Sequence, residues 1–297
     1  MSQKKITAVL TIALLLGLWM ITGAAQAFTP THGLLYEKEF KGVKFHVYTS
    51  PIPASASASV VIETKNYLIL QDTQQNKPQN DELKALISSL GKPLHRIYVS
   101  HDHSHHWAGL EMFEGVPIYA SKATIDSMKK TGKDELQSLK KKFGQEAIPY
   151  YKVVEPTHIV EAGTEDTIDG VRFVFSSPAP QLTGPVLFFE FPDQNVLIQH
   201  HLAYVSVHVP MPPVDARLAK LNELKVKEYA WVIGGHGIPV SGAEYAAKTV
   251  DYYTTLGKVI KESPDAATAK EKMVKAYPNY GGVFLLDMML PGFYKKP

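Results

Sequence analysis

The sequence predicts an α/β fold in which two β-sheets pack face to face and helices cover their outer faces. Three observations predict it. A strand, a loop, a helix and a second strand follow one another within residues 96–120. Short strand-like segments fill the centre, from residue 157 to 199, and a last strand followed by helices closes the chain. This order of elements is typical of layered α/β proteins.

The first 27 residues have the features of a secretory signal peptide. Lys4 and Lys5 form a basic start, residues 6–21 are an almost unbroken apolar run, and Ala25-Gln26-Ala27 has the small-x-small pattern that signal peptidase cuts. The run of about 16 residues is shorter than the roughly 20 that span a bilayer comfortably. A retained N-terminal anchor is the alternative. We expect cleavage after residue 27 and a single domain over residues 28–297, periplasmic or secreted, with no stable membrane anchor.

The charge balance argues against nucleic acid as a partner. The chain has 31 Lys+Arg and 29 Asp+Glu, and removal of Lys4 and Lys5 leaves 29 of each sign. A neutral chain lacks the basic surface that binds DNA or RNA, so we expect a small-molecule substrate. Cysteine is absent, and 45% hydrophobic residues permit a core that is stable without disulfides. The sequence does not indicate an oligomeric state.

The first half of the mature chain predicts strands around a strand–helix–strand unit. Residues 43–48 and 59–63 are predicted strands, and residues 67–70 pair with the second of them across Lys65-Asn66. Residues 81–90 have the apolar spacing of an amphipathic helix that ends at Gly91. The remaining predicted elements are a buried strand at 96–100, a helix at 107–113, a strand at 116–120 and a charged surface helix at 122–143.

The second half begins with strands and ends with helices. The predicted strands are residues 157–160, 166–169, 171–175, 186–191 and 196–199, and Asp169-Gly170 is a good hairpin turn. Residues 214–228 are a predicted helix. A short strand at 230–233 then ends at Gly234-Gly235-His236-Gly237, and helices follow at 243–262 and 266–276.

The strongest functional signal is a cluster of histidines on the loop after the buried strand. The segment Ser100-His101-Asp102-His103-Ser104-His105-His106 holds four imidazoles within six residues. Neutral imidazole is the commonest metal ligand, and the alternating His101 and His103 can point at one centre. A solvated polar loop is the alternative. We interpret the cluster as part of a metal site.

The cluster resembles the motif of a known family. His101-x-His103-x-His105-His106, followed by Trp107-Ala108-Gly109, is similar to the His-x-His-x-Asp-His loop of the metallo-β-lactamase superfamily, which an apolar residue and Gly-Gly usually follow. Gly235-His236-Gly237 resembles the site of that family's last metal ligand, and Leu70-Gln71-Asp72-Thr73 its early acidic strand end. The resemblance extends over the mature chain and implies a four-layer αββα sandwich.

The resemblance also implies a set of ligands. In the family, the first metal takes the two alternating histidines and a third from a central loop. The second metal takes the motif Asp, the adjacent His and the late His, and a carboxylate from another strand end bridges both. Carried over to this sequence, His101 and His103 belong to the first site, and His106 and His236 to the second.

Three positions depart from the family pattern. The motif Asp is replaced by His105. No histidine occupies the central loop at residues 178–184, where Gln181 is most nearly in register. The strand end that should carry the bridging carboxylate holds His200.

These departures change the expected chemistry. An anionic bridge normally offsets the repulsion between two divalent ions, and the neutral His200 cannot supply it. We therefore expect one tight zinc ion and a second that is weaker or absent, although other divalent transition metals also accept nitrogen ligands. The expected metal-binding residues are His101, His103, His105, His106, His200, His236 and, through a weak amide oxygen, Gln181.

The number of imidazoles on the ion separates two outcomes. Three imidazoles and one water form a catalytic zinc site, whereas four with no open position form a closed structural or storage site. His105 is a candidate catalytic residue, because an imidazole with an unperturbed pKa of about 6.5 suits a general base. A ligand role for His105 is equally open.

Other residues near these segments have two interpretations each. His201 and His208 are predicted to lie in a pocket or on the surface rather than to bind metal. Tyr204 and Met211 either form an apolar wall for a substrate or belong to a simple loop. Trp107 either fills the core or narrows the mouth of the site.

The leading hypothesis is an exported metal-dependent hydrolase in which metal-bound hydroxide attacks a carbonyl, lactone, lactam or ester. The family resemblance implies lactams, lactones, thioesters, or sulfate and phosphate esters as substrates. The alternative is a degenerate member that binds metal or a partner without hydrolysis, which the loss of both carboxylates favours. A redox metalloenzyme is a third possibility.

Overall fold

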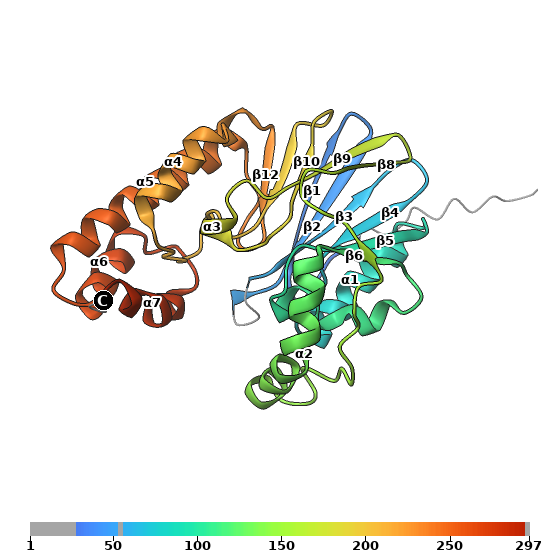
Figure 1. Ribbon diagram of the computed structural model, residues 1–297, viewed down its shortest axis with the longest axis horizontal. Coiled ribbons are helices and arrows are strands. Elements are labelled where there is room, and N and C mark those ends of the chain that lie inside the picture. Colours follow the sequence, from blue (N-terminus) through green and yellow to red (C-terminus); the bar gives the residue numbers. More distant parts are fainter. Residues whose placement is uncertain (1–27, 53–55, 295–297) are drawn as a thin grey trace, which may run out of the picture.

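The structure, a computed structural model, describes residues 28–52 and 56–294. The predicted signal peptide, residues 1–27, lies outside them. The described chain forms two facing sheets (Figure 1). The first contains, in order, β1 (Leu34–Phe40), β2 (Val43–Thr49), β3 (Ala58–Glu63), β4 (Leu68–Gln71), β5 (Leu94–Val99), β6 (Ile118–Ala120) and β7 (His158–Ile159). The second contains β12 (Trp231–Gly234), β11 (Val196–Gln199), β10 (Phe188–Phe191), β9 (Val171–Ser176) and β8 (Glu165–Ile168).

An aromatic and aliphatic core fills the space between the sheets. The alternation in β9 buries Val171, Phe173 and Phe175 on the face that points at the first sheet. Phe191 packs edge-on against Phe173, with ring centroids 4.8 Å apart, and against Phe45 of the first sheet at 5.0 Å. This shared core fixes the two sheets relative to each other.

Helices cover both outer faces, which completes the four layers (Figure 1). The first sheet is covered by α1 (Lys77–Ser89) and α2 (Lys122–Phe143), whose Leu83 and Met128 join its outer core. The second is covered by α5 (Gly242–Glu262), which contacts β12. The helices α4 (Val214–Glu223) and α6 (Ala266–Ala276) pack on α5, and α7 (Val283–Met289) packs on α6. The predicted α/β sandwich with an αββα order of layers is confirmed.

Some predicted boundaries were wrong. Helix α1 begins at Lys77, four residues before the predicted start, because a proline at position 78 is well suited to a first helical turn. The predicted helix at 107–113 is instead a pair of short 3₁₀ segments, Ser104–His106 and Ala108–Phe113. The predicted helix at 214–228 breaks at Lys225, which adopts a left-handed φ of 49°. Strand β1 and helix α7 were not predicted.

The turn between β8 and β9 has the predicted geometry. Asp169 and Gly170 have φ values of 54° and 81°, both positive, as the hairpin turns favoured by Asp-Gly require. The Asp169 carboxylate also accepts hydrogen bonds from the backbone and side chain of Asn66. This turn therefore ties the second sheet to the β3–β4 connection of the first.

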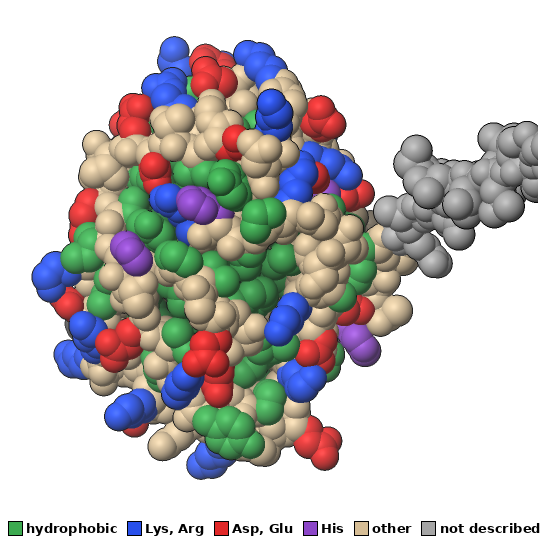
Figure 2. All heavy atoms as spheres, turned by 90° about the vertical axis from the view of Figure 1, so that its right-hand side faces the viewer, with side chains coloured by type: hydrophobic (Ala, Val, Ile, Leu, Met, Phe, Trp, Pro, Cys, Tyr) green, Lys and Arg blue, Asp and Glu red, His purple; other side chains and the backbone are tan. Residues whose placement is uncertain are grey.

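Within the described ranges, no helix has the length and apolar character needed to cross a membrane. Figure 2 shows the face of the molecule on the side of β4 and β8. Hydrophobic side chains gather at its centre, and acidic and basic side chains are interspersed around them.

Candidate metal centre

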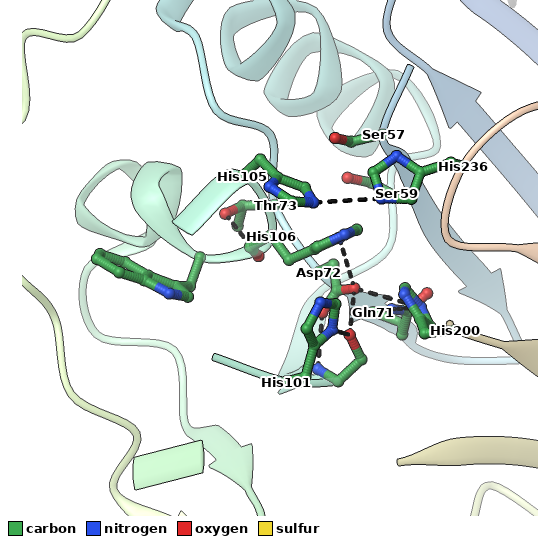
Figure 3. Close-up of polar contacts among 12 residues, drawn as sticks. Ser57, Ser59, Gln71, Asp72, Thr73, His101, His105, His106, His200 and His236 are labelled. Carbon is green, nitrogen blue, oxygen red and sulfur yellow. Dashed lines mark hydrogen bonds and ion pairs between the residues drawn. The ribbon is translucent and has the colours of Figure 1, made fainter. Parts of the chain in front are cut away.

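Parallel strands bring the candidate ligands to one end of the sandwich. In the first sheet β4 runs parallel to β5, with Gln71 opposite Tyr98, so Asp72 and His101 follow adjacent strand ends. In the second sheet β11 runs parallel to β12, so His200 and His236 also follow adjacent strand ends. The backbone N–H of Ala58 in β3 donates to Gly235 O, just after β12, at 2.9 Å, and this hydrogen bond connects the two sheets beside the site. The side chains of these segments converge around Asp72 (Figure 3).

Asp72 is a fully buried carboxylate at the centre of the cluster. Its φ of 58° is uncommon for a residue other than glycine, and such strained residues concentrate at functional sites. Oδ1 accepts from Ser100 N at 2.8 Å and Oδ2 from Ser100 Oγ at 2.7 Å. Burial raises the pKa of Asp72 to about 8, against the opposing effect of these hydrogen bonds. A buried carboxylate is costly without a nearby cation, so this site favours a bound positive charge.

Two histidine rings lie against the same carboxylate oxygen. Asp72 Oδ2 is 3.0 Å from His106 Nδ1, although the geometry is not that of a hydrogen bond. It is also 3.5 Å from His200 Nε2. Although the strand end at Asp72 was noted in the sequence, this residue was not predicted to belong to the site.

Three groups of side chains bring ligand atoms within 4.8 Å of one another and could hold a metal ion. They are Asp72 with His101, His106 and His200; His101 with His103 and His105; and His105 with His106 and His236. The third group contains the late histidine. His105 Nε2 and His236 Nε2 lie 3.2 Å apart. Two nitrogens bound at 2.0–2.1 Å to one tetrahedral zinc ion would lie about 3.3 Å apart. The His106 ring centroid lies 4.3 Å from that of His105 and 5.3 Å from that of His236. This spacing is compatible with His105 and His236 binding the same ion, and the general-base role of His105 stays a prediction.

A second group of imidazoles consists of His101, His103 and His201. Their ring centroids are 4.7 Å apart for His101 and His103, 4.4 Å for His101 and His201, and 4.7 Å for His103 and His201. His201 Nδ1 lies 2.9 Å from Thr183 O, which can only accept, so Nδ1 carries the proton and Nε2 keeps its lone pair. A neutral imidazole held in this tautomer is ready to bind a metal.

Burial and mutual repulsion keep five rings of the cluster neutral, those of His101, His105, His106, His200 and His201. Burial holds the pKa of His101, His105, His106 and His200 well below its usual range, and the neighbouring imidazoles lower it further. The pKa of His201 is lowered to about 3, mainly by burial and secondly by electrostatic repulsion from His103. Metal ligation requires unprotonated imidazole, so protons do not compete for the nitrogens at neutral pH.

Several buried nitrogens of the cluster lack hydrogen-bond partners among the described residues: His101 Nε2, His106 Nε2 and His200 Nδ1. Buried polar atoms in native proteins nearly always have partners, and a metal ion supplies one. The donor set, which is mostly nitrogen with one carboxylate, suits zinc and other divalent transition metals. The residues present therefore fit a metal ion.

Gly235 makes room for His200. A Cβ atom at this position would lie 2.0 Å from His200 Nδ1, so only glycine allows the ring to pack here. Gln71 Nε2 lies 3.2 Å from His200 Nε2 on the other side. His200 is thereby held at the strand end where the family resemblance places a bridging carboxylate.

No protein-family model matches the sequence, and no curated protein matches it. Solved structures do. A metallo-β-lactamase from Pontibacter korlensis is 16% identical and aligns over 74% of this chain and 99% of its own, with a TM-score of 0.56. The chain has the metallo-β-lactamase fold. Similar matches are a metallo-β-lactamase from Hirschia baltica (18% identity, 76% and 98% covered, TM-score 0.53) and the metallo-β-lactamase IND-7 (19%, 75% and 100%, 0.55).

Within this metallo-β-lactamase fold, the predictions for Gln181, Trp107 and His208 have different outcomes. Gln181 lies on the short helix α3 (Pro180–Thr183) with an exposed side chain, and its role as a ligand stays a prediction. Trp107 fills the core, and its Nε1 donates to Asp102 O at 2.6 Å. The prediction that His208 lies in a pocket or on the surface was wrong, because it is fully buried near Tyr252.

A cavity of about 590 Å³ opens beside the candidate metal centre. Four histidines from both imidazole groups line it: His103, His105, His201 and His236. Tyr204 and Met211 line it too, which supports the apolar-wall interpretation of the two alternatives. Four of the candidate metal-binding residues therefore face a space in which a small molecule can bind.

Replacing Asp72 by asparagine is expected to lower metal affinity about 10- to 100-fold. The amide keeps the shape but loses the charge that faces His106 Nδ1 and that balances the cation. Competition with a chromophoric chelator measures the affinity. Asp102→Asn is the matched control, because Asp102 lies on the histidine loop itself but its carboxylate accepts from Ser127 Oγ instead. Equal affinities for Asp72→Asn and the unmodified protein would contradict the role assigned to Asp72.

Proposed function

We propose that this protein is an exported, zinc-dependent hydrolase that cleaves a carbonyl, lactone, lactam or ester bond in a small molecule. One observation carries the proposal. His105 and His236 present their Nε2 atoms 3.2 Å apart, complete a group with His106, and line the cavity. Three imidazoles with one side open to a substrate-sized space form the ligand arrangement of a catalytic rather than a closed site. The signal-like residues 1–27 support export.

A zinc ion held there would supply Lewis-acid chemistry, polarising a carbonyl and activating water. The chain supplies the rest. Asp72 Oδ2 lies 3.0 Å from His106 Nδ1, so its negative charge would face the ion through the His106 ring. His101 and His103, which share His105 with the first group, could hold a second, weaker ion, and the His201 ring lies next to both. Tyr204 Oη accepts from His201 N at 2.8 Å, which leaves its own proton available to a group in the cavity.

The similar solved structures are described as metallo-β-lactamases, so lactams belong in the test panel with esters and lactones. We expect the purified mature protein to contain divalent metal and to hydrolyse at least one class. A chelator should abolish the turnover and added zinc should restore it. Turnover that persists in metal-free protein would contradict the proposal. Bound metal without turnover on any class would instead favour the non-enzymatic alternative.

A further inference from the structure

We infer that the substrate carries an unbranched apolar chain next to the bond that is cleaved, as in a medium-chain acyl ester, thioester or acyl-substituted lactone. This inference rests on the proposed function, since it names the substrate class of the same site. The observation behind it is the composition and position of the cavity walls, which continue from the histidines to helix α7.

The wall nearest the histidines is apolar. It consists of Leu182 from α3 and of Tyr204, Val207, Val209 and Met211 from the segment after β11. A polar substrate would leave its hydrogen-bonding groups unpaired against this wall, which costs free energy. An alkyl chain loses nothing there and gains from leaving water.

The outer wall leaves large apolar side chains in contact with water. Phe284 and Met288 of α7 line the cavity, yet they are 43% and 67% exposed. Their neighbours Leu285 and Met289 line it as well. Apolar patches of this kind mark ligand-binding grooves, and unbranched methionines adapt to chains of different shape. A substrate chain that lies along α7 would cover these residues.

The charges along the cavity suit an acid as product. None of the described residues that line it is acidic, and its charged side chains are Lys142 and Arg217. Arg217 is buried and donates to backbone carbonyls, so Lys142 at the end of α2 is the exposed cation. Hydrolysis of an acyl ester releases a carboxylate, which this lining tolerates, whereas it disfavours a cationic substrate.

Calorimetric binding of butanoate, hexanoate, octanoate and decanoate to the zinc-loaded mature protein tests the inference without turnover. We expect affinity to rise about fourfold for each added methylene until the cavity is filled, the fold-change that about 0.8 kcal/mol per buried methylene produces. Affinity that does not change with chain length would overturn the inference.

A charge placed in the outer wall tests the position of the chain. Met288→Glu is expected to lower octanoate affinity at least tenfold relative to butanoate, because the new carboxylate lies where the chain packs. Val283→Glu is the matched control, since Val283 lies on the same helix, is 37% exposed and is not part of the cavity wall. An equal loss in both variants, or none in Met288→Glu, would refute the assignment.

Kinetics with acetyl to decanoyl esters of one leaving group separate the inference from the proposed function. A kcat/KM that rises with chain length supports both. Hydrolysis of all esters at one rate, with flat binding, retains the hydrolase and overturns the chain preference. Chain-dependent binding without hydrolysis of any ester retains the apolar ligand site and removes the hydrolase.

Discussion

Replacing His236 by alanine is expected to abolish tight metal binding and to lower kcat/KM for the best substrate by about 10³-fold. His236 Nε2 lies 3.2 Å from His105 Nε2, so the two nitrogens face the same point, and the variant leaves two imidazoles there. A Lewis-acid metal contributes several kcal/mol to catalysis, and each 1.36 kcal/mol corresponds to a factor of ten in rate. Metal content by mass spectrometry and steady-state kinetics measure the two effects.

Two further measurements separate loss of a ligand from damage to the fold. His158→Ala, at an exposed histidine on β7, should keep full metal content and turnover. Because His236 lines the cavity, free imidazole can enter the space left by His236→Ala, and we expect millimolar imidazole to restore part of both signals. Full metal content and turnover in His236→Ala would remove this residue from the metal centre.

Replacing Arg217 by alanine is expected to lower the free energy of unfolding by about 3–5 kcal/mol. Its guanidinium is buried and donates to five backbone carbonyls, those of Leu182, His201, Leu202, Met211 and Pro212. The variant leaves these acceptors without their donor. Two of these carbonyls, those of His201 and Leu202, belong to the segment that carries His201 into the cavity wall. The variant should therefore also loosen this wall. Urea unfolding of the metal-free protein measures the change.

Two control variants define what Arg217 does. Arg217→Lys should lose nearly as much stability, because one ammonium group cannot replace a planar fork that reaches several carbonyls. Arg172→Ala removes an arginine that is 42% exposed and 3.4 Å from Glu165, and should change stability by less than about 1 kcal/mol. A loss below about 1 kcal/mol in Arg217→Ala would show that the loop is held by other contacts.

The layers of the fold could be predicted because local patterns decide them. Helix α2 begins at Lys122 and ends at Phe143 as expected, since Ser121 caps its start and Gly144 ends it. The Asp169-Gly170 turn followed from its residue types. The prediction of an α-helix after the histidine loop was wrong. The same apolar spacing suits a short 3₁₀ segment where the chain must turn back toward β6.

The candidate site was predicted less completely, because contacts between distant segments build it. The histidine loop is a local signal, and Gly-His-Gly at His236 was found through the family resemblance. Asp72 was missed as a site residue, although β4 and β5 are parallel neighbours whose ends must meet at one edge. His201 faces His101 and His103 only because the segment after β11 folds back onto α3, and no spacing in the sequence encodes that.

Anomalous diffraction from crystals grown with zinc tests the central claim most directly. We predict a strong zinc peak 2.0–2.1 Å from the Nε2 atoms of both His105 and His236, with His106 as the third ligand. A peak bound by neither His105 nor His236, or no peak in zinc-saturated crystals, would contradict the metal centre on which the proposed function depends.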